Sequence, residues 1–250
     1  EYEATIRLGY ATDTGDVTGK PIENEFHAKA QRPQSLRKEE IEAAITSLRG
    51  EIEQTPPMYS AKKIEGQKLY ELARRGEEVE RRPMRVTIHE IAALPAGGHP
   101  LKRNEDGTRD LRIRVVCSAG TYVRVLAEDV GRHLGTGAHL TELRRTRAGR
   151  FGIEQAVTID ELAESTASDS LAKILISSDA ALSHLPSIAL DEEQARRTLH
   201  GIDLRISRDQ ADSWHDRDAI RLTLEGELIA VGRFDASQGT VHPAVVLRID

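Results

Sequence analysis

The sequence contains a single cysteine, Cys117, in 250 residues. One thiol cannot form an internal disulfide framework, so disulfide-stabilised secreted domains are excluded and a reducing cytoplasm is expected. Every apolar run is too short to span a membrane. The histidines and Cys117 show no metal-ligand spacing, and the glycines of residues 131–137 follow a helical pattern, which disfavours a phosphate-binding loop. We therefore expect a cytoplasmic protein with no membrane partner and no metal.

The net charge of −6 is unevenly distributed along the chain. Residues 102–150 contain 11 basic and 6 acidic side chains, whereas residues 151–250 contain 9 and 18. A local basic face is sufficient for phosphate contacts, whatever the total charge. The middle of the chain is therefore a candidate nucleic-acid surface. The alternative is that its arginines only line the solvated faces of a strand and a helix.

The segment CSAGTYVR at residues 117–124 ends a predicted strand and begins a predicted helix. Apolar and charged residues alternate over 111–115, and the apolar positions that follow predict a helix from Thr121 to a C-terminal Gly135. Arg124 then lies three residues inside the helix, where the helix dipole disfavours a cation by a few tenths to about 1 kcal/mol. We expect a carboxylate or a phosphate beside Arg124. The alternative is an arginine that extends along the helix into solvent.

Alternation and capping signals predict the remaining elements. Strands are predicted at residues 1–9, 84–94, 111–117, 219–224, 228–234 and 241–249, with a long hairpin tip at 95–108. Helices are predicted at 35–48 and 69–75, and after capping boxes at 158–161 and 191–194. A break at 184–187 predicts two domains, residues 1–185 and residues 186–250. The sequence thus predicts an α+β protein.

Four long strings occur in order over essentially the whole chain, and such long ordered matches are specific. They are YEATIRLGYATDTGDVTG (2–19), PPMYSAKKIEGQKLYELARRG (56–76), CSAGTYVRVLAEDVGRHLGTGAHLTELRRTRAGRF (117–151) and VTIDEL (157–162). Together they resemble the bacterial tRNA pseudouridine-55 synthase family. The resemblance implies the pseudouridine synthase fold, with a mixed, mainly antiparallel sheet and flanking helices, followed by a small PUA-like β-rich domain.

The resemblance implies an RNA pseudouridine synthase, an isomerase that needs no cofactor. Such an enzyme flips uridine 55 out of the tRNA T-loop, cleaves its glycosidic bond with an aspartate and rejoins the base through a carbon–carbon bond. The implied partner is tRNA, bound through its T-stem-loop, and a monomer is expected. Two alternatives remain: a non-catalytic tRNA-binding or tRNA-folding module, and a related synthase that acts on rRNA or with a guide RNA.

Several residues match positions of known role in the family. Tyr2 matches the tyrosine that lies against the flipped base, and Arg124 matches the arginine that pairs with the catalytic aspartate, so both are predicted to be catalytic. By pattern alone, Tyr2 alternates with core residues and would only pack. Residues 57–85 match a thumb-like RNA-binding insertion, which we expect to be mobile without RNA. Substrate binding is predicted for Tyr122, Asp16, Lys63, Tyr59, Lys62, Arg144, Arg145 and Arg147.

The family's catalytic aspartate belongs to a segment of the type G-x-x-G-T-L-D-P, which precedes the strand that carries Tyr2. This sequence contains no such segment, and its strand pattern at residue 1 fits a chain that begins inside a larger protein. Asp13 and Asp16 follow Tyr2 and belong to a different motif. The aspartate partner of Arg124 is then expected outside this chain. We expect the chain alone to bind T-loop RNA weakly and to form no pseudouridine.

Overall fold

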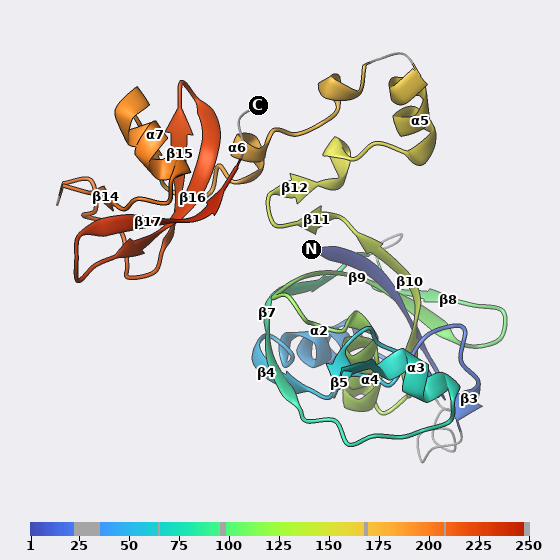
Figure 1. The fold of residues 1–250 in the computed structure, drawn as a ribbon. Coiled ribbons are helices and arrows are strands. Elements are labelled where there is room, and N and C mark those ends of the chain that lie inside the picture. Colours follow the sequence, from blue (N-terminus) through green and yellow to red (C-terminus); the bar gives the residue numbers. More distant parts are fainter. Residues whose placement is uncertain (23–35, 65, 96–98, 168–169, 208, 248–250) are drawn as a thin grey trace. The chain divides into compact units, whose positions relative to one another are not determined.

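The computed structural model describes residues 1–22, 36–64, 66–95, 99–167, 170–207 and 209–247. The chain divides into two compact units, Glu1–Ala156 and Val157–Asp250, drawn in Figure 1. The domain boundary predicted after residue 185 lies within the second unit and stays a prediction. Residues 35, 96–98 and 248–249 of the predicted elements lie outside the described residues.

An antiparallel sheet forms the framework of the first unit (Figure 1). Its strands follow the order β10-β1-β9-β7-β4, and β8 pairs with β9. They are β1 (Tyr2–Leu8), β4 (Gly50–Gln54), β7 (Met84–Ala93), β8 (Leu101–Arg103), β9 (Arg109–Cys117) and β10 (Ala138–Arg145). Because β1 lies between β9 and β10, Tyr2 pairs with Val115 on one side and with Arg145 on the other.

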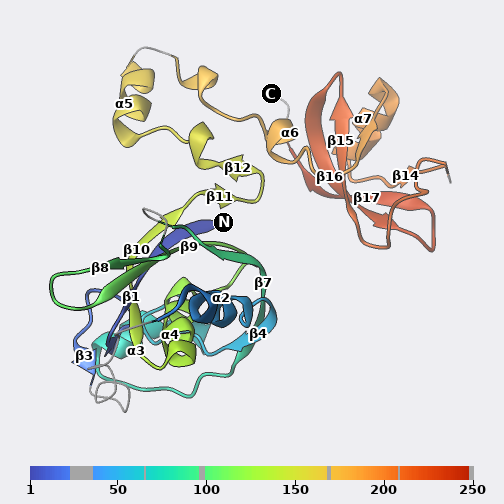
Figure 2. The same ribbon diagram turned by 180° about the vertical axis from the view of Figure 1, so that it is seen from behind.

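Two helices, α2 (Lys38–Thr46) and α4 (Val123–Leu134), cover one face of this sheet, as Figure 2 shows. Their apolar residues meet the inward-facing side chains of the strands, and the buried cluster includes Ile6, Leu8, Ile41, Ile88, Ile113, Leu126 and Val130. Gly131 lets α4 approach the start of β10 closely, because a Cβ there would lie 2.5 Å from the backbone nitrogen of Ala138. The apolar residues that alternate with polar ones along β1 and β9 face this core, as the sequence predicts.

Short elements connect these strands and helices. They are β2 (Ala11–Thr12), β3 (Pro21–Ile22), β5 (Lys63–Ile64), β6 (Gln67–Lys68), α3 (Leu69–Arg74), β11 (Arg147–Ala148), β12 (Phe151–Gly152) and the 3-10 helix η1 (Ile153–Gln155). The segment 57–85 contains β5, β6 and α3. The loop between β2 and β3 is anchored on β10, because Leu140 accepts a hydrogen bond from Val17 and donates one to the carbonyl of Gly15, both at 2.9 Å.

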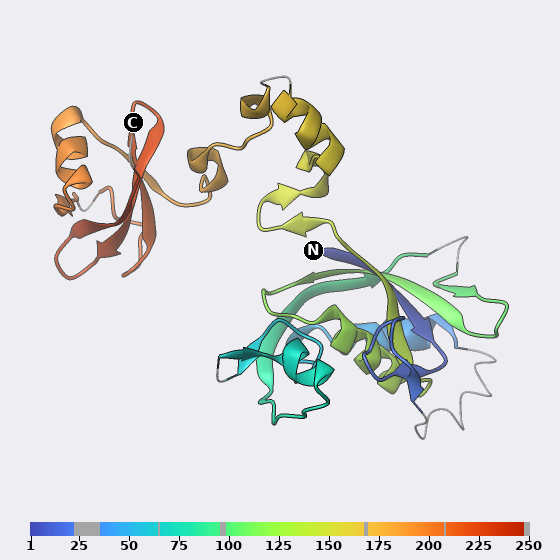
Figure 3. The ribbon, with the colours of Figure 1, turned by 45° about the vertical axis from the view of Figure 1, so that its right-hand side comes forward.

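The second unit contains a five-stranded sheet of order β13-β15-β16-β17-β14, in which β13 and β15 are parallel and the other pairs are antiparallel. Its strands are β13 (Ser187–Ala189), β14 (Leu204–Arg205), β15 (Ala219–Leu224), β16 (Glu227–Asp235) and β17 (Thr240–Val246). Its helices are α5 (Ile159–Ala167), η2 (Leu171–Lys173), α6 (Ser178–Ala181) and α7 (Glu192–Leu199). Figure 3 shows α7 beside the sheet, which it contacts at β15, β16 and β17.

Both predicted capping boxes form. The N–H of Glu161 donates to the Thr158 hydroxyl at 3.2 Å, and the N–H of Gln194 donates to the Asp191 carboxylate at 2.8 Å. The α+β class, the mainly antiparallel sheet and the β-rich C-terminal region are confirmed. Among the described residues, none of the helices combines the length and the apolar character that crossing a lipid bilayer requires.

Candidate active site

Arg124 lies in the first turn of α4, as the sequence predicts. The N-cap is Tyr122, one residue later than the predicted Thr121, and Gly135 ends the helix in the left-handed conformation with φ of 65°. The helix has no side-chain N-cap, and its first turn contains no acidic residue. The positive end of the helix dipole therefore adds to the charge of Arg124, and any compensating anion must come from another part of the fold.

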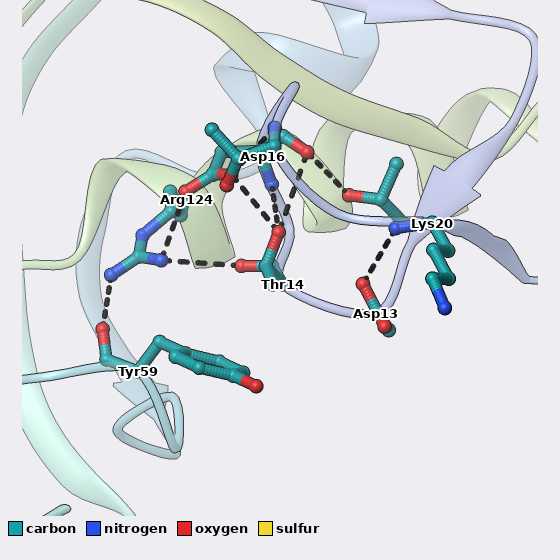
Figure 4. Close-up of polar contacts among 8 residues, drawn as sticks. Asp13, Thr14, Asp16, Lys20, Tyr59 and Arg124 are labelled. Carbon is teal, nitrogen blue, oxygen red and sulfur yellow. Dashed lines mark hydrogen bonds and ion pairs between the residues drawn. The ribbon is translucent and has the colours of Figure 1, made fainter. Parts of the chain in front are cut away.

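That anion is Asp16, in the loop between β2 and β3 (Figure 4). Nη1 of Arg124 lies 3.1 Å from Oδ2 of Asp16 and also donates to the carbonyl of Thr14 at 3.3 Å, while Nη2 donates to the carbonyl of Tyr59. Asp16 is thus the carboxylate that the sequence predicts beside Arg124. The pairing of Arg124 with the family's catalytic aspartate, from the G-x-x-G-T-L-D-P segment, stays a prediction. The β10 contacts of this loop bring the two residues together.

Asp16 is held in its charged form by its surroundings. Its Oδ1 accepts hydrogen bonds from the N–H of Thr18 at 3.0 Å and from the Thr14 hydroxyl at 2.9 Å. Burial raises the pKa of Asp16, but the hydrogen bonds from Thr18 and Thr14 and the charge of Arg124 outweigh burial, so the pKa lies below its usual value. The site thus contains a fixed ion pair at neutral pH.

Tyr2 lies on β1, directly opposite Arg145 on β10. The phenol oxygen of Tyr2 accepts a hydrogen bond from Nε of Arg145 at 3.1 Å, and the guanidinium carbon of Arg145 lies 5.3 Å from the centre of the ring. The ring is half-buried and packs against the core of the first unit. Tyr2 therefore combines the packing role that its alternation predicts with a charge-assisted contact at its hydroxyl.

The other predicted binding residues occupy three places. Tyr59 is 41% exposed, and its carbonyl contacts Arg124. Lys62 is half-buried with its amine beside the sulfur of Met84, whereas Lys63 on β5 is exposed. Arg144 and Arg147 are exposed at the ends of β10 and β11, and Arg147 lies 3.5 Å from the Glu1 carboxylate. The structure thus groups Arg124, Asp16 and Tyr59, and separately Tyr2 and Arg145.

Gln54, at the end of β4, is a residue of this site that the sequence analysis did not identify. Its buried side-chain amide bonds both backbone polar groups of Tyr122. No motif or periodicity singles it out, because a glutamine before two prolines is typical of a surface turn. Tyr122 itself is half-buried, and its backbone is what Gln54 contacts.

A cavity of about 410 Å³ lies between α4, the loop at 13–14 and the segment 53–59. Its lining includes Glu128 and Asp129. Burial raises the pKa of both carboxyls, and the charge of Asp129 raises that of Glu128 further. The lining also includes Arg81 and Arg132, but its acidic side chains outnumber these two arginines. This excess of carboxyl groups disfavours phosphate, so RNA backbone contacts are expected elsewhere. No cluster of potential ligands for a metal ion occurs in the part of the chain that the structure describes.

Comparisons with solved structures show the fold. The chain is similar to a chain in the crystal structure of a Cbf5-Nop10-Gar1 complex, with a TM-score of 0.63 and 21% identity, covering 100% of this chain and 64% of that one. It is also similar to a chain in the structure of an H/ACA RNP bound to a substrate RNA containing 2′-deoxyuridine, with a TM-score of 0.64 and 20% identity over 99% and 65% of the two chains.

Sequence comparisons show the family. Residues 1–123 match the model of the N-terminal domain of TruB family pseudouridylate synthases, and residues 124–183 match that of the tRNA pseudouridylate synthase B C-terminal domain. The chain is 45% identical to tRNA pseudouridine synthase B of Aromatoleum aromaticum, covering 97% of this chain and 70% of that protein. It is 38% identical to the protein of the same name from Ralstonia pickettii, over 97% and 73%. The chain therefore belongs to the TruB family of pseudouridine synthases.

Proposed function

We propose that the protein containing this chain converts uridine 55 in the T-loop of tRNA into pseudouridine. The observation that carries the proposal is the likeness, at 38–45% identity over most of the chain, to proteins named tRNA pseudouridine synthase B. The reaction is an isomerisation, in which the bond from C1′ to N1 breaks, a bond from C1′ to C5 forms, and the proton lost from C5 is balanced by one gained at N1. It is redox-neutral and needs no cofactor.

Arg124 and Asp16 are the proposed electrostatic centre of the site. Asp16 and the carbonyls of Thr14 and Tyr59 fix the guanidinium, so its position needs little reorganisation when a substrate or a catalytic carboxylate approaches. A fixed cation stabilises negative charge that develops during glycosidic cleavage. We propose that Tyr2 lies against the flipped base, and its half-buried ring supports this role because a base stacks well on an aromatic face.

The proposed RNA contacts surround these residues. Tyr59, Lys62 and Lys63 belong to the segment 57–85, for which closure over the T-stem-loop and mobility without RNA remain predictions. Tyr122 is proposed to line the base pocket. The arginines at 144, 145 and 147 are proposed to contact phosphates, and their exposure supports this. We also propose that the protein is a cytoplasmic monomer.

Tritium release from RNA containing uridine labelled at C5 tests the function, because isomerisation frees the C5 hydrogen whereas binding or base flipping alone does not. The full-length protein is incubated with a T-stem-loop, with the same hairpin carrying cytidine at position 55, and with an rRNA fragment that contains uridines. We expect release from the uridine hairpin alone. Release from the rRNA fragment at an equal rate would favour a synthase of different specificity, and tight binding without release would favour a non-catalytic tRNA-binding module.

A further inference from the structure

Gln54 is a buried amide whose two polar atoms both bond to one residue. Gln54 is 2% exposed. Its Oε1 accepts a hydrogen bond from the N–H of Tyr122 at 2.9 Å, and its Nε2 donates to the carbonyl of Tyr122 at 3.3 Å, across 68 residues of sequence. Because an unsatisfied polar group is costly in a buried position, each partner holds the other in place.

Tyr122 is the residue at which α4 begins. The helix has no side-chain N-cap, and the carbonyl of Tyr122 also accepts a helical hydrogen bond from Leu126 at 3.1 Å. The Gln54 amide therefore fixes the orientation of the peptide groups on both sides of the N-cap. Arg124 follows two residues later, so a rotation of the N-cap backbone would move its guanidinium away from Asp16.

Gln54 is itself fixed by the sheet. It is the last residue of β4, and it pairs with Met84 of β7. Five residues after it, the carbonyl of Tyr59 accepts a hydrogen bond from Arg124. The segment 54–59 thus contacts the start of α4 at two points, one through the backbone of Tyr122 and one through the side chain of Arg124.

We propose that Gln54 is a positioning residue for the isomerisation, which holds the start of α4 so that Arg124 meets Asp16. Only an amide offers a donor and an acceptor side by side at this place. A glutamate side chain can still accept from the Tyr122 N–H, but its second oxygen faces the Tyr122 carbonyl, which is also an acceptor. A methionine side chain is similar in length and has neither the amide donor nor the amide acceptor. The kinetic part of this inference rests on the proposed function, whereas its structural part does not.

The kinetic test compares Gln54→Met with Gln238→Met, which alters an exposed glutamine in the turn between β16 and β17 of the second unit. In tritium release by the full-length protein, we expect kcat to fall about tenfold in Gln54→Met, with the KM for tRNA changed less than about twofold, because a small misplacement of a fixed group mainly affects the transition state. Gln238→Met should leave both constants unchanged. An unchanged kcat in Gln54→Met, or equal losses in the two variants, would overturn the proposal.

Coupling to Arg124 separates positioning from general structural damage. In an Arg124→Lys background, Gln54→Met should lower the single-turnover rate by less than about twofold, since the group that it positions is already altered. A full tenfold loss in that background would show that Gln54 acts independently of Arg124. If Gln54→Met does not fold, Gln54→Glu replaces it, with a loss of kcat at least as large expected, because its second oxygen repels the Tyr122 carbonyl.

Hydrogen exchange at the Tyr122 amide tests the contact without any activity. We expect exchange at this N–H to accelerate at least about tenfold in Gln54→Met, while exchange in the middle of β9 stays unchanged. Unchanged Tyr122 exchange would overturn the proposal even in an active enzyme. If the unsubstituted protein shows no tritium release, the proposed function is wrong. The exchange rate of the Tyr122 amide then still shows whether Gln54 holds the start of α4.

Discussion

The guanidinium of Arg124 lies 3.1 Å from the carboxylate of Asp16, although 108 residues separate them in the sequence. The side chains are 23% and 25% exposed, so solvent screens their attraction less than that of a surface ion pair. The local structure around Arg124 or Asp16 does not by itself determine the position of either side chain. The helix start, the β10 contacts of the Asp16 loop and the carbonyl of Tyr59 together fix the pair.

A double-mutant cycle with Asp16→Asn and Arg124→Met should give a coupling free energy of about 1 kcal/mol or more for unfolding of the chain in urea. The exposed pair of Glu193 and Arg196 is the matched control, with side chains 64% and 66% exposed. Its cycle should give less than about 0.5 kcal/mol, because exposed pairs gain little. Equal coupling in both cycles would contradict the claim that burial strengthens the Arg124–Asp16 pair.

His139 should make the first unit sensitive to mild acid. Its ring is fully buried, with Nδ1 3.0 Å from the carbonyl of Tyr10. Burial lowers the pKa of His139. The unfolded state therefore binds a proton first, so stability is full above the unfolded pKa of about 6.5 and declines as the pH falls toward the folded pKa, by at most about 1.4 kcal/mol per pH unit.

The measurement is the free energy of unfolding in urea at several pH values between about 5 and 8, followed through NMR signals of the first unit. In the His139→Gln variant, the free energy of unfolding should fall less steeply as the pH is lowered, because the buried imidazole is gone. The His133→Gln variant, altered at an exposed position of α4, should show the same dependence on pH as the unsubstituted protein. An identical slope in all three proteins would show that His139 is not the titrating group.

Gly131→Ala should destabilise the first unit although alanine favours helices more than glycine does. The added Cβ would lie 2.5 Å from the backbone nitrogen and from the Cβ of Ala138, and a main chain in a sheet cannot move aside freely. We expect a loss of about 1–3 kcal/mol, typical of overpacking. Gly131 lies inside α4 and is not among the glycines with positive φ, so the loss would come from the contact with Ala138 and not from backbone strain. A stabilised Gly131→Ala protein would contradict the close helix–strand contact.

Replacement of Arg144 and Arg145 by alanine, one at a time, should weaken tRNA binding and reduce its dependence on salt. If an arginine contacts one phosphate, its removal should lower the slope of log Kd against log salt by about one. Tyr2 no longer has the partner of its hydroxyl in the Arg145 variant, so this variant should also show a lower rate. Arg196→Ala in the second unit serves as the control. A slope unchanged in both arginine variants would exclude phosphate contacts at positions 144 and 145.

The sequence predicted β1, β7 and β9 because apolar and polar residues largely alternate there. It did not predict β4 or β10, and the physical reason is different for each strand. The sequence of β4, GEIEQ, is short and mostly polar because the strand lies at the edge of the sheet. The last residues of β10, from Glu142 to Arg145, are all exposed, so only pairing with the distant β1 shows that they form a strand.

The candidate site was predictable to a similar degree. A cation in the first turn of a helix requires an anion, and the sequence predicted one beside Arg124. The identity of that anion depends on how the loop at 13–17 joins β10 at Leu140, which no local pattern specifies. Gln54 was missed because its role arises from a long-range contact with backbone atoms, which leave no trace in residue spacing.

The most direct test of the account is single-turnover tritium release from a tRNA T-stem-loop by the full-length protein and its Asp16→Asn, Arg124→Ala and Arg196→Ala variants. We expect rates at least about a hundredfold lower in the first two variants, because fixed charges at a reacting centre typically contribute this much, and an unchanged rate for Arg196→Ala. Full activity in Arg124→Ala, with the label still released from uridine 55, would contradict the claim that this ion pair is the centre of the active site.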